Sequence, residues 1–313
     1  MEDKRKTEIE YDLQKRKGRL GQLQIYVAKF YRIFWYEKGW KVILFSVIIS
    51  GILAYVLGDK IYKEREYTKT ALFAMVCAML WVGIFNSIQN VCREREIIKR
   101  EHRTGLHISA YVAAHVIFQA GICAIQAVLM LLIYSVTMEF PSGGAVTGNF
   151  YLDMFICFFL IIFSADMLGL AISSLVRNTT VAMTVLPFVL IIQLIFGGVV
   201  FSLHGSVKKV SDFTLSKWDQ QALMIEADMN DIPSTILEKQ IKKLKKIKPE
   251  WTETLNMIPE GIIENLASEM TYDKKLEVKA EPVIDVWQKL LLFSVVFIGI
   301  SVISLEFIDK DKR

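Results

Sequence analysis

The sequence predicts an all-α integral membrane protein with six transmembrane helices. Hydrophobic residues make up 53% of its 313 residues, which is more than a soluble domain of this length requires. Six separate stretches are apolar enough to cross a hydrocarbon core about 30 Å thick, which takes roughly 20 helical residues. Lysine and arginine also gather in alternate loops, as in multi-pass proteins. A buried helix of a soluble protein would explain one such stretch but not six.

The segment before the first span, residues 1–40, is expected to stay in the cytoplasm. Its first 18 residues, MEDKRKTEIEYDLQKRKG, are charged and lack the apolar core of a secretory signal. Residues 19–38, RLGQLQIYVAKFYRIFWYEK, then place apolar and basic side chains at helical spacing, with several aromatic rings. This pattern is typical of an amphipathic helix lying in the headgroup region. A cytoplasmic extension of the first span is the alternative.

The spans are expected at 41–58, 70–91, 110–137, 150–176, 180–203 and 287–307. Residues 41–203 thus hold the first five spans, joined by short links, and residues 287–313 hold the sixth span with a tail. Basic residues are frequent before the first span and in the link 92–109, and they are absent from the link 138–149. The positive-inside rule therefore predicts a plasma (inner) membrane protein with both termini in the cytoplasm.

The segment 204–286 differs from the rest because it is long and polar. It lies between the last two spans, so we expect a large extracytoplasmic domain there. Its middle, STILEKQIKKLKKIKPEW, alternates apolar and lysine side chains at helical spacing. That amphipathic helix would either pack on the domain or lie on the outer membrane surface.

Motifs of nucleotide, metal and hydrolase chemistry are absent. No G-x-x-x-x-G-K-[ST] phosphate loop occurs. The four histidines lack a metal-ligand spacing, and the four cysteines lie in or beside spans, which predicts no disulfide framework. The net charge of +4 reflects membrane topology and implies no nucleic-acid partner. We therefore expect no enzyme activity, metal or cofactor in this chain itself.

Polar residues inside the spans are few, and each requires a partner. An ionisable group in a membrane costs a few kcal/mol on insertion scales, so Asp166 calls for a partner or a water-filled cavity. For the amides, such as Asn86, interhelical hydrogen bonds are favoured over substrate contact. For His115, a packed and hydrogen-bonded ring is favoured over a functional one.

The densest charge cluster lies in the link between the second and third spans. Residues 93–104 are expected to form a short helix on the cytoplasmic side, with Glu96 and Arg100 as an i,i+4 ion pair. Arg95, Lys99 and Arg103 would form a like-charge ridge on that helix, which an acidic partner would stabilise. The cluster is therefore predicted to dock onto a soluble subunit. A plain topology anchor is the alternative.

The stretch CREREIIKREHRTGLHISAYVAAHVI resembles the first intracellular loop of type-2 ABC exporter permeases, and in particular of the G-subfamily. The matching positions are Glu94-Arg95, Arg100-Glu101, Gly105-Leu106 and Tyr111. The stretch MLGLAISSLVRNTTVAMTVLPFVLIIQLIFGGVVF at 167–201 is similar to the fourth and fifth spans of that family. The long loop before the last span is a third point of similarity, so the resemblance covers roughly residues 20–308.

The resemblance implies six spans per permease, two permeases per transporter, identical or related, and two ATP-binding domains. It implies that 19–37 is a connecting helix and that 93–104 is a coupling helix, which contacts the ATPase. The implied coupling residues are Arg93, Glu94, Arg95, Lys99, Arg100, Glu101 and Arg103. The implied substrate-pathway residues are Met79, Val82 and Asn86 on the second span, Ile191 and Leu194 on the fifth, and the plug residues Val199 and Val200.

The sequence departs from the eukaryotic G-subfamily in two ways, because it carries no ATPase and no cysteines in the long external segment. It is more similar to a bacterial split transporter. We therefore expect an exporter permease for a hydrophobic or amphipathic substrate, with ATP and Mg²⁺ bound by a separate partner chain. The alternative is a non-transport membrane scaffold or sensor whose external segment binds a ligand or partner.

Overall fold

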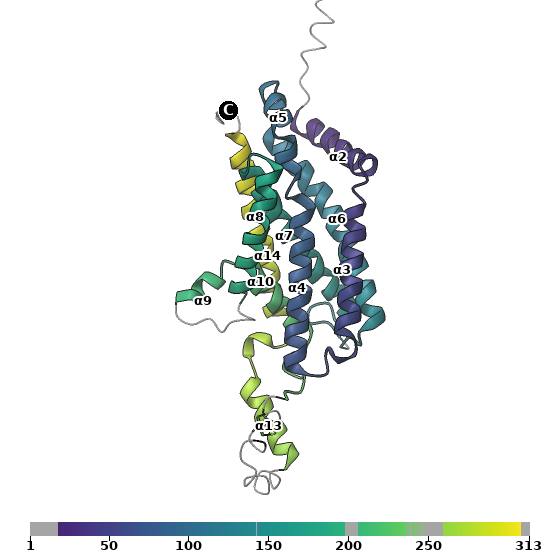
Figure 1. Ribbon diagram of the computed structural model, residues 1–313, viewed down its shortest axis with the longest axis vertical. Helices are drawn as coiled ribbons and strands as arrows, with labels where there is room; N and C mark the ends of the chain where they lie inside the picture. Colours follow the sequence, from purple (N-terminus) through teal and green to yellow (C-terminus); the bar gives the residue numbers. More distant parts are fainter. Residues whose placement is uncertain are drawn as a thin grey trace, which may run out of the picture.

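The computed structural model describes residues 18–141, 143–197, 206–235 and 259–307, together with the single positions 237, 240, 241, 243 and 246. In these residues the chain is all-helical, without β-strands. The helices run side by side in an elongated bundle (Figure 1). α7 (Phe150–Leu175) is central, because it packs against both α4 (Arg65–Ser87) and α14 (Ala280–Glu306).

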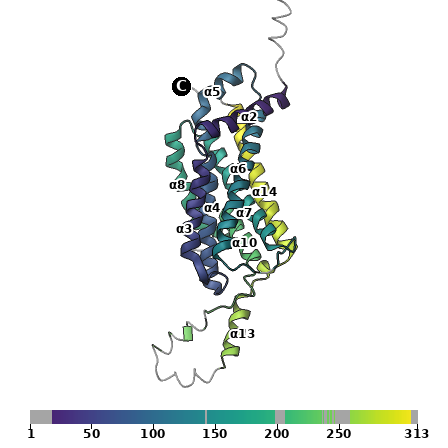
Figure 2. The same ribbon diagram turned by 90° about the vertical axis from the view of Figure 1, so that its right-hand side faces the viewer.

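The other long helices of the bundle surround these three. They are α3 (Lys41–Leu57), α6 (Ile108–Thr137) and α8 (Thr179–Phe196). Two helices lie at one end of the bundle, α2 (Arg19–Tyr36) and α5 (Asn90–Arg103) (Figures 1 and 2). The shorter elements are η1 (Gly58–Lys60), α9 (Ser206–Ser211), α10 (Leu215–Glu226), α13 (Glu260–Thr271) and η3 (Lys274–Leu276).

The predicted spans agree with this architecture. Among the described residues, five helices are long and apolar enough to cross a membrane by themselves. The number rises to six if α2 and α3, which meet at an angle of 66°, form one bent span. The largest differences at span boundaries are at α14, which begins at Ala280 rather than at residue 287, and at α8, which ends at Phe196 rather than at residue 203.

The bend between α2 and α3 has a local cause in the sequence YEKGW. The Gly39 amide donates to the Phe34 carbonyl at 2.7 Å, and the Lys38 amide donates to the Trp35 carbonyl at 3.4 Å. This is the Schellman arrangement that ends a helix, and it puts Lys38 in the left-handed region with φ 57°. A Cβ on Gly39 would lie 2.5 Å from the Phe34 ring. The turn therefore fixes the direction of α2 relative to the bundle.

Close helix contact holds α4 against α7. A Cβ on Gly83 would lie 2.4 Å from the Ile162 carbonyl oxygen, and one on Gly169 would lie 2.6 Å from the Ile84 carbonyl oxygen. The Ser87 hydroxyl donates across the same contact to the Asp166 carbonyl at 2.5 Å. Small residues allow the two backbones to approach, as at many helix interfaces in membranes.

The described residues of the segment 204–286 do not show the predicted large extracytoplasmic domain. In its described part, α10 packs into the bundle against α4, α7, α8 and α14. α13 lies beyond the end of the bundle opposite α5 (Figures 1 and 2). The predicted amphipathic helix STILEKQIKKLKKIKPEW falls mostly outside the described residues.

Candidate functional site

α5 turns two different faces to its surroundings. Its inner face carries Glu94, Ile98 and Glu101, which are buried or half-buried, and its outer face carries Glu96 and Arg100, which are exposed. The helix confirms the predicted secondary structure of 93–104, although it begins three residues earlier, at Asn90. Charged side chains therefore occupy both faces, but only the outer face is open to another molecule.

The inner face of α5 is bonded to α2. The Tyr26 hydroxyl donates to the Glu101 carboxylate at 2.7 Å, and the Lys29 ammonium lies 3.5 Å from the Glu94 carboxylate. Near the outer rim, Arg93 forms an ion pair with Glu37 at 3.0 Å. Three of the predicted coupling residues thus connect α5 to α2.

The turn after α5 is bonded to α2 as well. The Gln22 side chain donates to the Gly105 carbonyl at 3.0 Å and accepts from the His107 amide at 2.9 Å. Because one side chain satisfies two backbone groups of this turn, the start of α6 is fixed relative to α2. No local sequence pattern indicates a role for Gln22, since its partners lie more than 80 positions away.

Arg95 has a different partner from the one predicted. Its guanidinium donates to the Ser174 carbonyl at 2.8 Å and to the Val176 carbonyl at 3.1 Å, at the end of α7. The last carbonyls of a helix lack intrahelical donors and carry partial negative charge, so a cation there is favourable. The like-charge ridge of α5 is therefore stabilised in part by a helix end, and an acidic partner for the ridge stays a prediction.

The outer face of α5 is charged and accessible. The predicted Glu96–Arg100 ion pair is wrong for the described structure, where both side chains are exposed and no contact joins them. Arg103 is also exposed, and Lys99 is half-buried. The exposed charges Glu96 and Arg100 are the predicted docking features that remain available to a partner.

The predicted pathway residues fall into three groups. Met79 and Val82 are fully buried in the core of this single chain. Ile191 of α8 is 50% exposed and Leu194 is half-buried. Val199 and Val200 lie outside the described residues. The contribution of Met79 and Val82 to a pathway stays a prediction. In this conformation both side chains contact other helices of the bundle.

Asn86 belongs to a polar network between α4, α6 and α7. Its side-chain amide exchanges two hydrogen bonds with Gln126, at 2.8 and 3.1 Å. The Cys123 thiol donates to Asp166 Oδ2 at 3.2 Å, which is the partner that a carboxyl group inside a span requires. The expected interhelical bonding of the amides is confirmed for Asn86.

The apolar surface between α3 and α8 includes one side of α4. Trp81 is 42% exposed and stacks on the half-buried ring of Phe85, with 5.7 Å between ring centroids. Phe45 of α3 lies 6.2 Å from Phe85 between ring centroids. The two flanking helices carry further exposed apolar residues, Ile48 and Ile52 of α3, and Phe188, Ile191, Ile192 and Ile195 of α8. We call this surface the α3–α4–α8 face.

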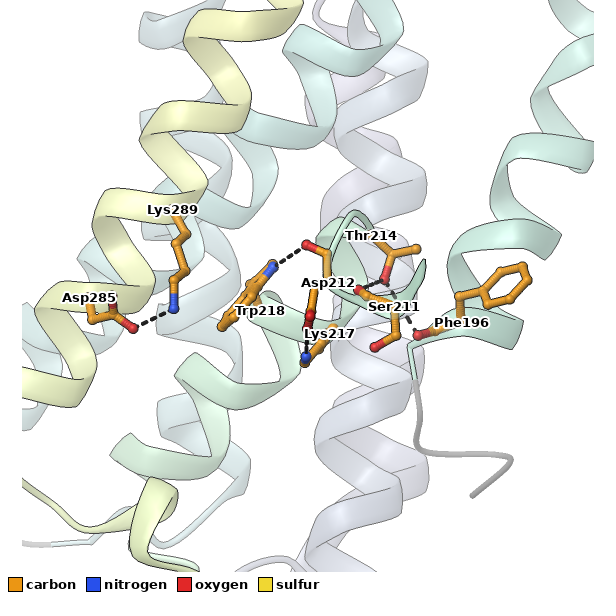
Figure 3. A network of polar contacts seen from close by, with 8 residues as sticks. All are labelled: Phe196, Ser211, Asp212, Thr214, Lys217, Trp218, Asp285 and Lys289. Carbon is orange, nitrogen blue, oxygen red and sulfur yellow. Dashed lines mark hydrogen bonds and ion pairs between the residues drawn. The ribbon is translucent and has the colours of Figure 1, made fainter. Parts of the chain in front are cut away.

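At the other end of the bundle, α10 is fastened to α8 and α14 (Figure 3). The Thr214 hydroxyl lies 3.5 Å from the Phe196 carbonyl. The Trp218 indole donates to the Asp212 carbonyl at 2.9 Å, and the Lys289 ammonium lies 3.8 Å from the centre of the Trp218 ring. Lys289 also pairs with Asp285 at 2.5 Å. α10 is thereby part of the helical bundle.

Comparison with known proteins agrees with this geometry. A family model described as ABC-2 type transporter matches residues 22–213, which include every helix from α3 to α9. An ABC transporter ATP-binding/permease protein of Mycobacterium tuberculosis is 27% identical over 153 residues, or 48% of this chain. The match spans 18% of the length of that relative. The helical bundle and the family match together confirm the resemblance: the chain belongs to the ABC-2 type transporter family and is a multi-pass transmembrane subunit of such a transporter.

Proposed function

We propose that this chain is the permease subunit of an ATP-driven exporter, in which a separate ATP-binding subunit docks on the outer face of α5. The observation that carries the proposal is the two-faced contact pattern of α5. Its exposed face offers Glu96 and Arg100, and its inner face is bonded to α2 through Tyr26 and Lys29. Movement of a subunit docked on the outer face would therefore be transmitted to the bundle through these bonds.

Two routes lead from α5 into the bundle. One runs through α2 to the bend at Gly39 and on to α3. The other runs through Arg95 to the end of α7, the central helix. Because interfaces of packed helices switch between discrete arrangements, closure of two ATP-binding subunits would drive alternating access through these two routes. In this proposal α5, both chain termini and the ATP-binding subunits lie on the cytoplasmic side of the plasma membrane.

The substrate pathway in this proposal follows the α3–α4–α8 face, where a second permease chain would complete it. Aromatic and aliphatic side chains dominate this face, including Trp81, Phe188 and Ile191. Such a surface favours a hydrophobic or amphipathic substrate. Met79 and Val82 would line the pathway only in a state where α4 turns relative to α7.

The ATP and Mg²⁺ chemistry is assigned to the partner subunit. The printed name of the mycobacterial relative combines an ATP-binding and a permease function in one protein. In the proposed assembly these two functions lie on separate chains, and this chain supplies the membrane part.

The proposal is tested by ATPase measurements on this chain in lipid nanodiscs, co-expressed with an ATP-binding subunit encoded beside it. Arg100→Glu reverses an outer-face charge that forms no bond with the described residues, so it should change ATPase activity severalfold and leave the elution profile as in wild type. Lys60→Glu is the matched control, since Lys60 is exposed in η1 at the opposite end of the bundle.

Equal activity of the two variants would count against α5 as the docking element. Failure of any ATP-binding subunit to co-purify would favour the scaffold or sensor alternative.

A further inference from the structure

A pocket of about 550 Å³ lies between the helices at the α5 end of the chain. Five helices contribute to it, α2 to α6. Its lining includes Phe30, Phe34, Glu94, His115, Phe118 and Gln119. The volume is within the range of about 300–1,000 Å³ that is usual for small-molecule sites.

Aromatic rings form the apolar part of the lining. Phe34 and Phe118 meet edge to face, with 5.6 Å between ring centroids. Phe30 stacks on the His115 ring at 3.9 Å. Ring systems pack well against such walls in offset or edge-on geometry, so the pocket favours an occupant with a compact ring-containing body.

The deeper part of the lining is polar. His115 and Gln119 are each less than 5% exposed. The Nε2 atom of His115 lies 3.0 Å from the Tyr111 hydroxyl, whereas its Nδ1 atom has no hydrogen-bond partner among the described residues. A buried polar atom without a partner costs free energy. A ligand hydroxyl would remove this cost in either tautomer of the ring, because it both donates and accepts.

The charges of the pocket argue against an anionic occupant. The lining contains two carboxylates, Glu37 and Glu94, and one guanidinium, Arg93. Arg93 already forms an ion pair with Glu37 at 3.0 Å on the exposed rim. Glu94 forms an ion pair with the Lys29 ammonium. An anion would therefore enter a pocket whose carboxylates are already paired and whose lining offers no unpaired cation.

We propose that this pocket binds a compact, uncharged amphiphile with an aromatic or alicyclic body and a hydroxyl or N–H group that bonds His115 and the neighbouring amides. The site is complete within one chain. It differs in this from the substrate pathway proposed above, which needs two chains, although Phe85 of the α3–α4–α8 face and the implied pathway residue Asn86 also line the pocket.

The test uses tritiated N-phenylnaphthylamine, a neutral aromatic compound with one N–H group. Saturable binding to the full chain in nanodiscs is measured by scintillation proximity, with an excess of unlabelled compound. Its sulfonated relative, anilinonaphthalenesulfonate, has the same body and a negative charge, so it should compete at least about tenfold more weakly, which corresponds to about 1.4 kcal/mol.

Substitutions locate the site. Ile122→Trp fills the pocket and should abolish saturable binding, as should Val42→Trp from the half-buried opposite wall. Ile125→Trp is the matched control on α6, because Ile125 is 48% exposed and does not line the pocket. His115→Phe keeps the stack on Phe30 but removes the ring nitrogens, so affinity should fall about three- to tenfold, as expected for one lost hydrogen bond.

Equal binding by the Ile122→Trp and Ile125→Trp variants would overturn the proposal, as would an absence of saturable binding to wild type. Equal competition by the sulfonate would refute the neutral specificity. A photoreactive azide of the same compound gives an answer without any substitution. Crosslinks confined to the lining residues of α2 to α6 support the site. Crosslinks spread over the exposed faces of α3, α8 and α14 contradict it.

Discussion

The Tyr26 hydroxyl of α2 donates a 2.7 Å hydrogen bond to the Glu101 carboxylate of α5, and 75 positions of sequence separate the two residues. Together with the two bonds of Gln22 to the turn after α5, it joins two surface helices into one unit. Core packing supplies only part of what holds α2, because Phe30 is the one buried residue of that helix. Polar bonds therefore define the geometry of the proposed docking surface.

Removal of the Tyr26 hydroxyl should loosen this unit. The Tyr26→Phe variant loses a hydrogen bond to a charged acceptor, which is worth about 1.5–3 kcal/mol. We expect a lower melting temperature in detergent and faster hydrogen exchange in α2. Tyr31→Phe is the matched control, because Tyr31 is 47% exposed on the same helix, and it should behave as wild type. Equal exchange rates in α2 of both variants would mean that the bond does not hold the helix.

The contact between α4 and α7 should tolerate no side chain at Gly169. In the Gly169→Ala variant the new methyl group would lie 2.6 Å from a backbone oxygen of α4, so the two helices must separate. Overpacking of this kind costs about 1–3 kcal/mol, and thermal unfolding in detergent measures it. Gly299→Ala in α14 meets nothing within 4 Å and should leave stability unchanged or slightly higher, since alanine favours helix. A neutral Gly169→Ala would show that the contact is looser than described.

Apolar length predicted the spans well, because a membrane helix must bury about 20 apolar residues regardless of its neighbours. α6 and α7 agree with their predicted ranges to within two residues at each end. The burial of α10 within the bundle was not predicted, because apolar length does not identify a helix of polar composition. Its buried side includes Ser216, Asp219 and Glu226, so its composition is polar although its position is internal.

The candidate site was predictable in its location but not in its bonds. The charge cluster and the family resemblance both indicated residues 93–104, and α5 occupies that range. The partners of Arg95 and Glu101 lie on α7 and α2, and no local spacing can reveal partners so distant in sequence. The expected Glu96–Arg100 pair was wrong because helical spacing permits an exposed ion pair without making it favourable.

Arg65 should control how the segment after α8 is held at the start of α4. Its guanidinium donates to the Met229 and Thr271 carbonyls, and its amide donates to the Pro233 carbonyl at 3.0 Å. The Arg65→Met variant leaves the two carbonyls without a donor, and each such loss costs about 1–3 kcal/mol.

We expect faster hydrogen exchange in residues 226–235 and 260–276 of the Arg65→Met variant, with the bundle itself unchanged. Lys63→Met is the control from the same link, because its pair with Glu139 at 3.6 Å is exposed and contributes little. If Arg65→Met exchanges no faster than Lys63→Met, the segment is held by other contacts.

Glu226, at the end of α10, should make stability depend on pH. Its side chain is 2% exposed, and its two oxygens have no hydrogen-bond partner among the described residues. Burial, and next the nearby carboxylate of Asp153, raise the pKa of the Glu226 carboxyl from 4.5 to about 7. Burial also raises the pKa of Asp219 on the same helix, so its contribution has the same sign.

The direction follows from proton counting. Between pH 4.5 and about 7 the folded chain holds a proton on Glu226 that the unfolded chain has released. The free energy of unfolding therefore falls as the pH rises through this window, by about 1.4 kcal/mol for each unit of pKa shift at most. The melting temperature of wild type, measured in detergent, should be lower at pH 7.5 than at pH 5. Glu226→Gln has no proton to release, so its melting temperature should fall less over the same range. Glu139→Gln is the control, because its side chain is 87% exposed, and its melting temperature should change with pH as in wild type. If the melting temperature of Glu226→Gln also changes as much as in wild type, Glu226 is already ionised in the folded chain at pH 5.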